Sequence, residues 1–361
     1  MKTLLINNSI SLIASLIVTF IVLKLLLKYS IKLKLVDLPN ERKLHKTPIP
    51  SIGGLVIVIA LLLVMMIIPS MRTFLFSNYI LFLCFLALSI TGIADDRLDI
   101  SAKFRLLVEV GCAFAVAHAG IRLTSLHGIM GITTLPVFVQ YALTIFILTG
   151  VTNAFNLIDG IDGLAGGIAL TNIVLLAALS FIAGLFDWFT FFIAAIASII
   201  VFLKFNWRPA KLFMGDGGSL PLGFMMSASG ILLINKIGAK QINYLPMAVV
   251  VVAVSFLIPV MDTIRVFYTR VSAGKSPFAA DKNHLHHWLI RQHLVHNQAT
   301  KRVLGFHIVL LILGLLIIQL FTITAVIVTL TLLVILYTKA LQLSSYFHRW
   351  YKFVKRMEAA R

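Results

Sequence analysis

Charged residues are scarce in this sequence. They make up 12% of its 361 residues, whereas 60% are hydrophobic and the mean hydropathy is +1.01. A soluble globular domain carries about 25% charged and about 45–50% apolar residues, so the composition excludes that class as well as disordered and collagen-like chains. Cysteine is rarer still. Cys84 and Cys112 fall inside apolar runs, which argues against a disulfide framework or a cysteine zinc site.

Long apolar runs recur along the chain, each about 17–22 residues and long enough to cross a bilayer as a helix. We expect an all-α polytopic membrane protein with about 11 transmembrane helices, forming a single domain over residues 1–361. The first run is interpreted as an uncleaved span, because basic residues follow it. The expected spans are at about 6–27, 52–69, 79–94, 105–123, 136–154, 163–184, 189–205, 218–235, 245–264, 303–320 and 323–340.

Lysine and arginine are distributed unevenly between alternate loops. One side of the membrane carries 25 of them and the other side 5, with Lys24 inside the first span. Because basic residues concentrate in cytoplasmic loops, this asymmetry predicts an N-terminus outside and a C-terminus in the cytoplasm. The expected partner of this charge is the lipid bilayer and not nucleic acid. The predicted cytoplasmic segments are about 28–51, 95–104, 155–162, 206–217 and 265–302, with a tail at 341–361.

Acidic residues number only 13, and most aspartates lie in or beside the predicted cytoplasmic connections, whereas Asp187 lies clearly on the outer side. Ionisable groups at membrane depth are costly, so acids gathered at one face indicate a polar site or a bound ion. The alternative is that some only cap helices or balance nearby basic residues. The aspartates on the cytoplasmic side are Asp95, Asp96, Asp99, Asp159, Asp162, Asp216, Asp262 and Asp281.

Asp95 and Asp96 end one apolar span and precede Arg97. Adjacent helical residues point about 100° apart, so the two acids are expected to have different roles. The alternative is a solvated helix end paired with Arg97.

The segment 153–167 carries the strongest signal. Asn156, Asp159 and Asp162 are three residues apart, so a continuing helix would place them along one face, where carboxylates repel unless a cation lies nearby. Glycines within the segment allow close approach of a ligand, or alternatively form a helix-packing seam.

A second glycine-rich segment, 213–219, leads into the span at 218–235. Asp216 or Ser219 could serve as an N-cap. Otherwise the turn presents free N–H groups that favour phosphate, and Asp216 holds a hard divalent cation. Oxygen ligands from Asp and Asn suit magnesium or manganese better than zinc.

Three histidines, His284, His286 and His287, lie in the largest predicted cytoplasmic loop, with Arg265 near its start. A zinc site is one reading, but the absence of a neighbouring cysteine or well-spaced acid disfavours it. We expect the histidines and arginines to contact phosphate oxygens instead. The isolated histidines, interpreted as structural, are His118, His127, His307 and His348.

Four segments together, 94–97, 153–167, 214–223 and 284–287, resemble the polyprenyl-phosphate N-acetylhexosamine-1-phosphate transferase superfamily, and the loop at 45–54 is a fifth match. The chain is most similar to the bacterial undecaprenyl-phosphate N-acetylglucosamine-1-phosphate transferases of glycosyltransferase family 4. The leucine within the histidine cluster favours this branch over the enzymes that use UDP-MurNAc-pentapeptide, which usually carry consecutive histidines.

The resemblance implies transfer of an N-acetylhexosamine 1-phosphate from a UDP-sugar to undecaprenyl phosphate, and it favours GlcNAc-1-phosphate as the transferred group. UMP is released, and the step begins cell-envelope polysaccharide synthesis at the bacterial inner membrane. The implied cofactor is Mg²⁺, with Mn²⁺ as the alternative, and a homodimer is compatible. The implied metal ligands are Asp216 and Asn156. The implied catalytic residues are Asp95, Asp96, Asp159 and Asp162. The implied substrate-binding residues are Lys46, Lys103, Asn156, Arg265, His284, His286 and His287.

Two rival functions are weaker. A CDP-alcohol phosphatidyltransferase needs an Ala-Arg pair that the residues after Asp159-Gly160 lack. A transporter or flippase is expected to place acids near the bilayer midplane, whereas these acids lie at span ends.

Overall fold

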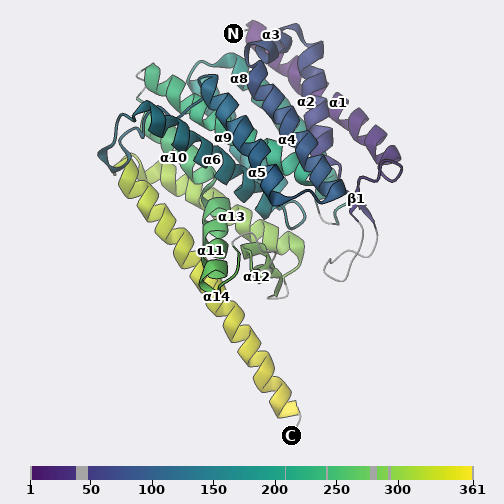
Figure 1. Cartoon of the computed structure of the whole chain (residues 1–361), viewed down its shortest axis with the longest axis vertical. Helices are drawn as coiled ribbons and strands as arrows, with labels where there is room; N and C mark the ends of the chain where they lie inside the picture. Colours follow the sequence, from purple (N-terminus) through teal and green to yellow (C-terminus); the bar gives the residue numbers. More distant parts are fainter. Residues whose placement is uncertain are drawn as a thin grey trace.

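The computed structural model describes residues 2–37, 48–207, 209–240, 243–276, 283–291 and 294–359. Within these residues the chain forms a bundle of helices, with one short antiparallel strand pair (Figure 1). The all-α prediction is therefore confirmed. The elements are α1 (Lys2–Tyr29), β1 (Val36–Asp37), β2 (Ile49–Pro50), α2 (Gly53–Ile67), α3 (Pro69–Ser77), α4 (Tyr79–Leu98), α5 (Ala102–His118), η1 (Ile129–Gly131), α6 (Val137–Ile158), α7 (Leu164–Ile182), α8 (Phe186–Asn206), α9 (Asp216–Ala239), α10 (Leu245–Ser255), α11 (Leu257–Ser272), α12 (Leu285–Arg291), α13 (His296–Ile317) and α14 (Ile323–Ala359).

Eight helices in the described part of the chain are long and apolar enough to cross a membrane, or up to ten if each of two bent pairs counts as one span. This confirms a polytopic membrane protein. The predicted count of about 11 is not confirmed: the expected span at 105–123 corresponds to α5, which has 17 residues and ends at His118. The sidedness of the two termini stays a prediction.

Helix α9 is the buried centre of the bundle, because every residue of its membrane window is covered by neighbours such as α4 and α6. Pro221 lies inside this helix and has no N–H to donate to the carbonyl of Gly217. The hydroxyl of Ser89 on α4 donates to that carbonyl instead, at 2.8 Å. The carbonyl that Pro221 leaves without a donor therefore accepts a hydrogen bond that joins α4 to α9.

The predicted span at 245–264 is bent by 47° between α10 and α11. Pro259 explains the break, since it leaves the carbonyl of Ser255 without its helical donor. The side-chain amide of Asn172 on α7 donates to that carbonyl at 2.9 Å. The span predicted at 52–69 is also interrupted: α2 and α3 meet at 112° where Pro69 begins α3.

Several helix ends differ from those expected, and two of these differences affect the acidic residues. Helix α4 continues through Asp95 and Asp96 to Leu98. Helix α6 stops at Ile158 and α7 begins at Leu164, so Asp159 and Asp162 lie in a turn and not on a continuing helix. The predicted tail from 341 also begins within a helix, since α14 runs unbroken to Ala359. The geometry of the turn between α6 and α7, and not helical periodicity, therefore sets the direction of the Asp159 and Asp162 carboxylates.

Candidate active site

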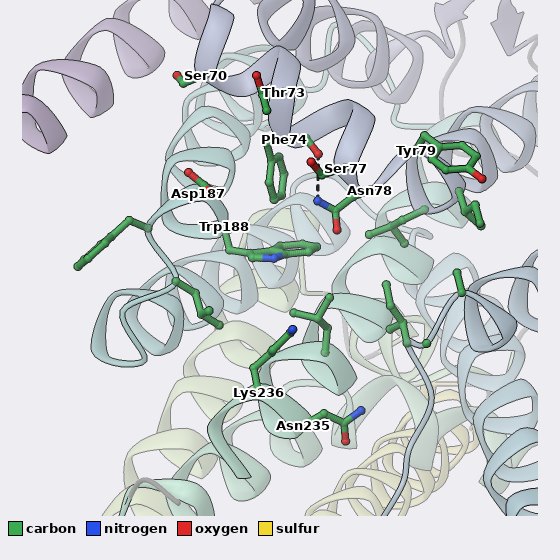
Figure 2. Close-up of a pocket in the computed structure, with 18 of the residues that line it drawn as sticks. Ser70, Thr73, Phe74, Ser77, Asn78, Tyr79, Asp187, Trp188, Asn235 and Lys236 are labelled. Carbon is green, nitrogen blue, oxygen red and sulfur yellow. Dashed lines mark hydrogen bonds between the residues drawn. The ribbon is translucent and has the colours of Figure 1, made fainter. Parts of the chain in front are cut away.

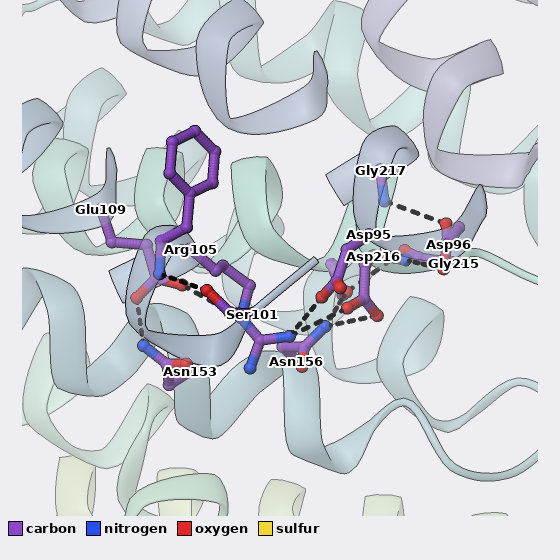
Figure 3. Close-up of polar contacts among 12 residues, drawn as sticks. Asp95, Asp96, Ser101, Arg105, Glu109, Asn153, Asn156, Gly215, Asp216 and Gly217 are labelled. Atoms are coloured by element: carbon purple, nitrogen blue, oxygen red, sulfur yellow. Dashed lines mark hydrogen bonds and ion pairs between the residues drawn. The ribbon is translucent and has the colours of Figure 1, made fainter. Parts of the chain in front are cut away.

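Four helix ends bring the acidic residues together: the end of α4, the start of α5, the end of α6 and the start of α9 (Figure 3). At their centre is Arg105, on the first turn of α5. Its Nη1 lies 2.6 Å from Asp95 Oδ2 and 3.2 Å from Asp216 Oδ2. Its Nε lies 3.6 Å from Oε1 of the fully buried Glu109. One guanidinium therefore contacts three carboxylates.

Asp96 faces differently from its neighbour Asp95, as the 100° helical separation predicts. Its Oδ1 accepts a hydrogen bond from the N–H of Asp216 at 3.2 Å, and its Oδ2 accepts one from Gly217 at 3.4 Å. The next two N–H groups, of Gly218 and Ser219, donate to the carbonyl of Gly215 at 3.0 Å each. A carboxylate from another helix thus caps α9. The expectation that this turn offers free N–H groups to phosphate is wrong, because Asp96 and Gly215 already accept from them.

Asn156 ends α6 beside the first turn of α9. Its Nδ2 donates to Asp216 Oδ1 at 2.8 Å and to Ser219 Oγ at 2.9 Å. One turn earlier, Asn153 donates to Glu109. Two amides on α6 therefore orient Glu109 and Asp216, two of the three carboxylates that contact Arg105.

The glycines at 54 and 218 are required by close packing. A Cβ on Gly54 would collide with the backbone of Gly218, and a Cβ on Gly218 would collide with Gly54. This contact is fixed by backbone hydrogen bonds from Gly53 to Phe213 at 2.8 Å and from Gly54 to Met214 at 2.9 Å. The start of α2 is thereby placed against the start of α9.

A cavity of about 810 Å³ opens beside this cluster. Burial raises the pKa of the Asp159 carboxyl to about 8, and repulsion from Asp216 and Asp96 adds to the effect. The polar lining residues include Asp37, Ser51, Asp96, Asp159, Asp162, Asn206, Asp216, His287 and His296, and the apolar ones include Ile49, Ile161, Pro209, Phe213, Ile290, Leu294 and Val295.

The histidine motif is anchored by Asp262, a buried residue of α11. Asp262 Oδ2 lies 2.9 Å from His284 Nδ1, and Oδ1 lies 2.6 Å from Arg265 Nη2. Arg265 also stacks on the Trp288 ring, with 3.9 Å between its Cζ and the ring centroid. His284 and Arg265 therefore hold the loop together behind the cavity wall.

His286 is buried as well, against Gly160, where a Cβ would collide with the imidazole. Burial, together with the charge of neighbouring His287, lowers the pKa of His286 to about 3. The ring is therefore neutral at pH 7. Of the three motif histidines, His287 is the one that lines the cavity.

The structure brings together many of the expected site residues and separates others. Lys103 is exposed on the first turn of α5 and does not line the cavity, and Lys46 lies outside the described residues. Asp95 and Asn156 stand behind the wall, linked to Asp216 directly or through Arg105. Of the predicted site residues, those that line the cavity are Asp96, Asp159, Asp162, Asp216 and His287.

Arg105, Glu109 and His296 are among the polar residues of this region that sequence reasoning missed. Glu109 had a visible signal, an acid within the expected span at 105–123. His296 had none, since it stands apart from the histidine motif. Its Nδ1 lies 3.1 Å from Asp162 Oδ1, across a sequence separation of 134 residues.

A second and larger cavity, of about 1090 Å³, lies at the opposite end of α9 (Figure 2). Asp187 is the one carboxylate in its described lining, and Lys236 is the one basic side chain. Hydroxyls, amides and the Trp188 indole complete its polar wall. The grouped carboxylates, and not the cavity volume, identify the smaller cavity as the candidate active site.

The carboxylate cluster suits a hard divalent cation. Among the described residues, no three His, Cys, Asp or Glu side chains are arranged to hold a metal by themselves. Mg²⁺, however, is usually held by one or two protein carboxylates, with water and substrate phosphates completing its oxygen shell. Asp216 is a carboxylate of this kind, and Asn156 contacts it through the amide nitrogen, which also donates to Ser219.

Fold and site together define a polytopic membrane protein with a carboxylate-lined cavity at one end of its bundle. A family model described as glycosyl transferase family 4 matches residues 78–234, which include Asp95, Asp96, Arg105, Asn156, Asp159 and Asp216.

Curated relatives extend the match. The undecaprenyl-phosphate alpha-N-acetylglucosaminyl 1-phosphate transferase of Yersinia pestis is 36% identical over 283 residues, covering 75% of this chain and 74% of the relative. The proteins of the same name from Escherichia coli K12 and Salmonella typhi are each 32% identical, over 75% and 80% of this chain and 73% and 78% of the relatives. The chain belongs to glycosyl transferase family 4, as its motifs predicted.

Proposed function

We propose that this protein transfers N-acetylglucosamine 1-phosphate from UDP-N-acetylglucosamine to undecaprenyl phosphate and releases UMP. The names of the relatives support this substrate pair. The observation that carries the proposal is the convergence of Asp95, Asp96, Asn156, Asp216 and Arg105 beside one cavity. These groups suit charge on phosphoryl oxygens.

We further propose that Mg²⁺ is the cofactor and that Asp216 and Asn156 hold it. When bound, it would supply positive charge to the diphosphate of the nucleotide sugar. Arg105 contributes a second, fixed positive charge beside Asp216. Two polyanionic substrates are thereby able to approach a wall rich in carboxylates.

The remaining polar groups position the phosphates. Asp159, in the turn after α6, lines the cavity that receives the phosphates. Asp96 is committed to the cap of α9 and fixes the start of that helix. A lipid phosphate is already largely ionised at pH 7, so orientation, rather than proton removal, is the main requirement for its attack.

Attack falls on the phosphorus attached to the sugar. The phosphoanhydride bond breaks, UMP leaves, and the anomeric C–O bond stays intact. The lipid product is therefore a diphosphate, and the anomeric configuration of the sugar is retained.

The bond that breaks is tested with UDP-N-acetylglucosamine labelled with ³²P at the β-phosphate. Purified protein, Mg²⁺ and undecaprenyl phosphate should move the label into the lipid fraction and release unlabelled UMP. A glycosyltransferase that breaks the anomeric bond would leave the label in UDP, and that outcome would overturn the proposal. UDP-N-acetylgalactosamine and UDP-MurNAc-pentapeptide in parallel assays report sugar selectivity, and proteoliposomes that take up substrate without product would indicate a transporter.

A further inference from the structure

His296, the first residue of α13, lies in the wall of the active-site cavity next to Asp162. Its Nδ1 is 3.1 Å from Asp162 Oδ1. Because a carboxylate accepts hydrogen bonds, Nδ1 carries a proton and donates it. The other ring nitrogen, Nε2, has no hydrogen bond among the described residues, and the side chain keeps 19% of its surface exposed.

Asp162 is itself held firmly in place. The N–H of Ala210 donates to its Oδ2 at 3.4 Å. Thr300, one turn along α13 from His296, donates from Oγ1 to the backbone carbonyl of Asp162 at 2.8 Å. The turn after α6 and the start of α13 are therefore locked together, and this lock fixes the orientation of the imidazole.

The charge of the wall shows what such an imidazole is suited to bind. Five aspartates line the cavity, whereas the imidazoles of His287 and His296 are the only basic side chains among its described lining residues. A diphosphate entering this cavity needs hydrogen-bond donors. An imidazole with a carboxylate at Nδ1 and a phosphate oxygen at Nε2 donates from both nitrogens.

We propose that His296 is a substrate-binding residue that contacts the diphosphate of the nucleotide sugar through Nε2, and that Asp162 is its positioning residue. The inference rests on the proposed function, since it takes a nucleotide diphosphate sugar as the ligand. In this inference, Asp162 orients the His296 ring and does not contact the reacting phosphorus.

Three variants at one position test this assignment. His296→Ala removes both nitrogens. In His296→Asn the amide occupies the place of Nδ1, which keeps the contact with Asp162 and loses the contact with substrate. In His296→Gln the amide reaches the place of Nε2. His118→Ala, at the far end of α5, is the matched control.

We expect His296→Ala and His296→Asn to raise the KM for UDP-N-acetylglucosamine about 10-fold, the loss of one hydrogen bond to a charged group. Their kcat, their KM for undecaprenyl phosphate and their unfolding midpoint in detergent should stay near those of the wild type. His296→Gln should recover most of the loss. Equilibrium binding of tritiated UDP-N-acetylglucosamine without lipid acceptor should weaken by the same factor.

The opposite pattern would overturn the inference. If His296→Asn binds nucleotide sugar normally, the ring serves only to hold Asp162. A decrease confined to kcat and the unfolding midpoint leads to the same conclusion. These results are distinct from failure of the proposed function, in which the wild-type protein itself transfers no β-phosphate label to lipid.

Discussion

The two cavities lie at opposite ends of one buried helix and differ in the kind of polar group that lines them. Asp216 begins α9 and Lys236 lies twenty residues later, which corresponds to roughly 30 Å along the helix. The smaller cavity, of about 810 Å³, has five aspartates in its wall, whereas the larger one, of about 1090 Å³, has one. Volume alone would select the larger cavity, whereas the convergence of charged groups selects the smaller one as the candidate active site.

The difference arises from how each wall is built. At the larger cavity, Phe74 and Trp188 pack edge to face with their ring centroids 5.0 Å apart, and this packing needs no charge. At the smaller cavity, helix ends meet and their polar residues satisfy one another, as Asp96 does for α9. Helix ends thus supply the charged groups of the smaller cavity, and aromatic packing supports the larger cavity at the opposite end.

The largest expected difference is that the two cavities open on opposite sides of the membrane. In a background with Cys84→Ala and Cys112→Ala, Ser77→Cys in the larger cavity should react in intact cells with a membrane-impermeant thiol reagent. Ser276→Cys, after α11, should react only once the cells are permeabilised. Both positions are exposed in the structure. Reaction of the Ser276→Cys variant from outside would reverse the predicted orientation and place the active site on the wrong face.

The next contrast compares two aspartates in the first turns of α9 and α8. Asp216→Asn keeps the shape of the side chain but removes its charge. We expect a loss of at least about 100-fold in transfer rate, which is about 2.7 kcal/mol. Asp187→Asn should change the rate by less than about 2-fold. Rates of lipid labelling measured over a range of Mg²⁺ concentrations decide the matter: an active Asp216→Asn with normal Mg²⁺ dependence would show that Asp216 is not a metal ligand.

A smaller contrast compares the basic residues of the two ends. Arg105→Gln leaves Asp95 and Asp216 without their shared guanidinium, so we expect kcat/KM to fall about 10-fold. Lys236→Gln should have little effect. Arg105→Lys keeps the charge but loses the forked geometry and should be intermediate. Steady-state kinetics on the purified variants measures all three, and equal activities of the Arg105→Gln and Lys236→Gln variants would contradict the assignment.

The smallest expected effect concerns the dependence of stability on pH. The pKa of His286 is about 3 in the folded protein, below its ordinary value of 6.5, so the folded state disfavours protonation. This contribution to stability is fully present above pH 6.5 and is lost progressively as the pH falls towards 3. At pH 5.5 the loss is about 1 kcal/mol.

Unfolding midpoints in detergent at pH 7.5 and 5.5 measure this loss. His286→Gln should flatten the difference between the two pH values, whereas His118→Gln, at the exposed far end of α5, should not. A wild-type midpoint difference that His286→Gln leaves unchanged would assign the pH dependence to other groups.

The sequence located the acidic residues of the site because they are rare in an apolar chain and repeat at short intervals. Asp159 and Asp216 were found in this way and both line one cavity, and Asn156 contacts Asp216 from behind the cavity wall. Pairings across long separations were beyond sequence reasoning. Arg105 meets Asp216 across 111 residues, and His296 meets Asp162 across 134. Such contacts depend on how helices pack, which periodicity alone does not specify.

The predicted helix ends also differ from those in the structure, because they too depend on tertiary contacts. Proline marks the breaks near Pro69 and Pro259, yet Pro221 lies within an unbroken α9. The sequence shows the missing donor in each case. Only the fold shows that Ser89 supplies a replacement within α9.

The length of α14 has a consequence for where the membrane surface lies. Its apolar part, Ile323–Phe347, spans roughly 38 Å, enough to cross a hydrocarbon layer of about 30 Å. The remaining twelve residues to Ala359 add roughly 18 Å, and α14 extends past the rest of the bundle (Figure 1). Because α12 packs on α14, the histidine motif is held at a fixed position along this helix. If the protein has the proposed function, we expect the cavity to lie near the plane of the lipid phosphates, where the lipid and the nucleotide sugar can both reach it.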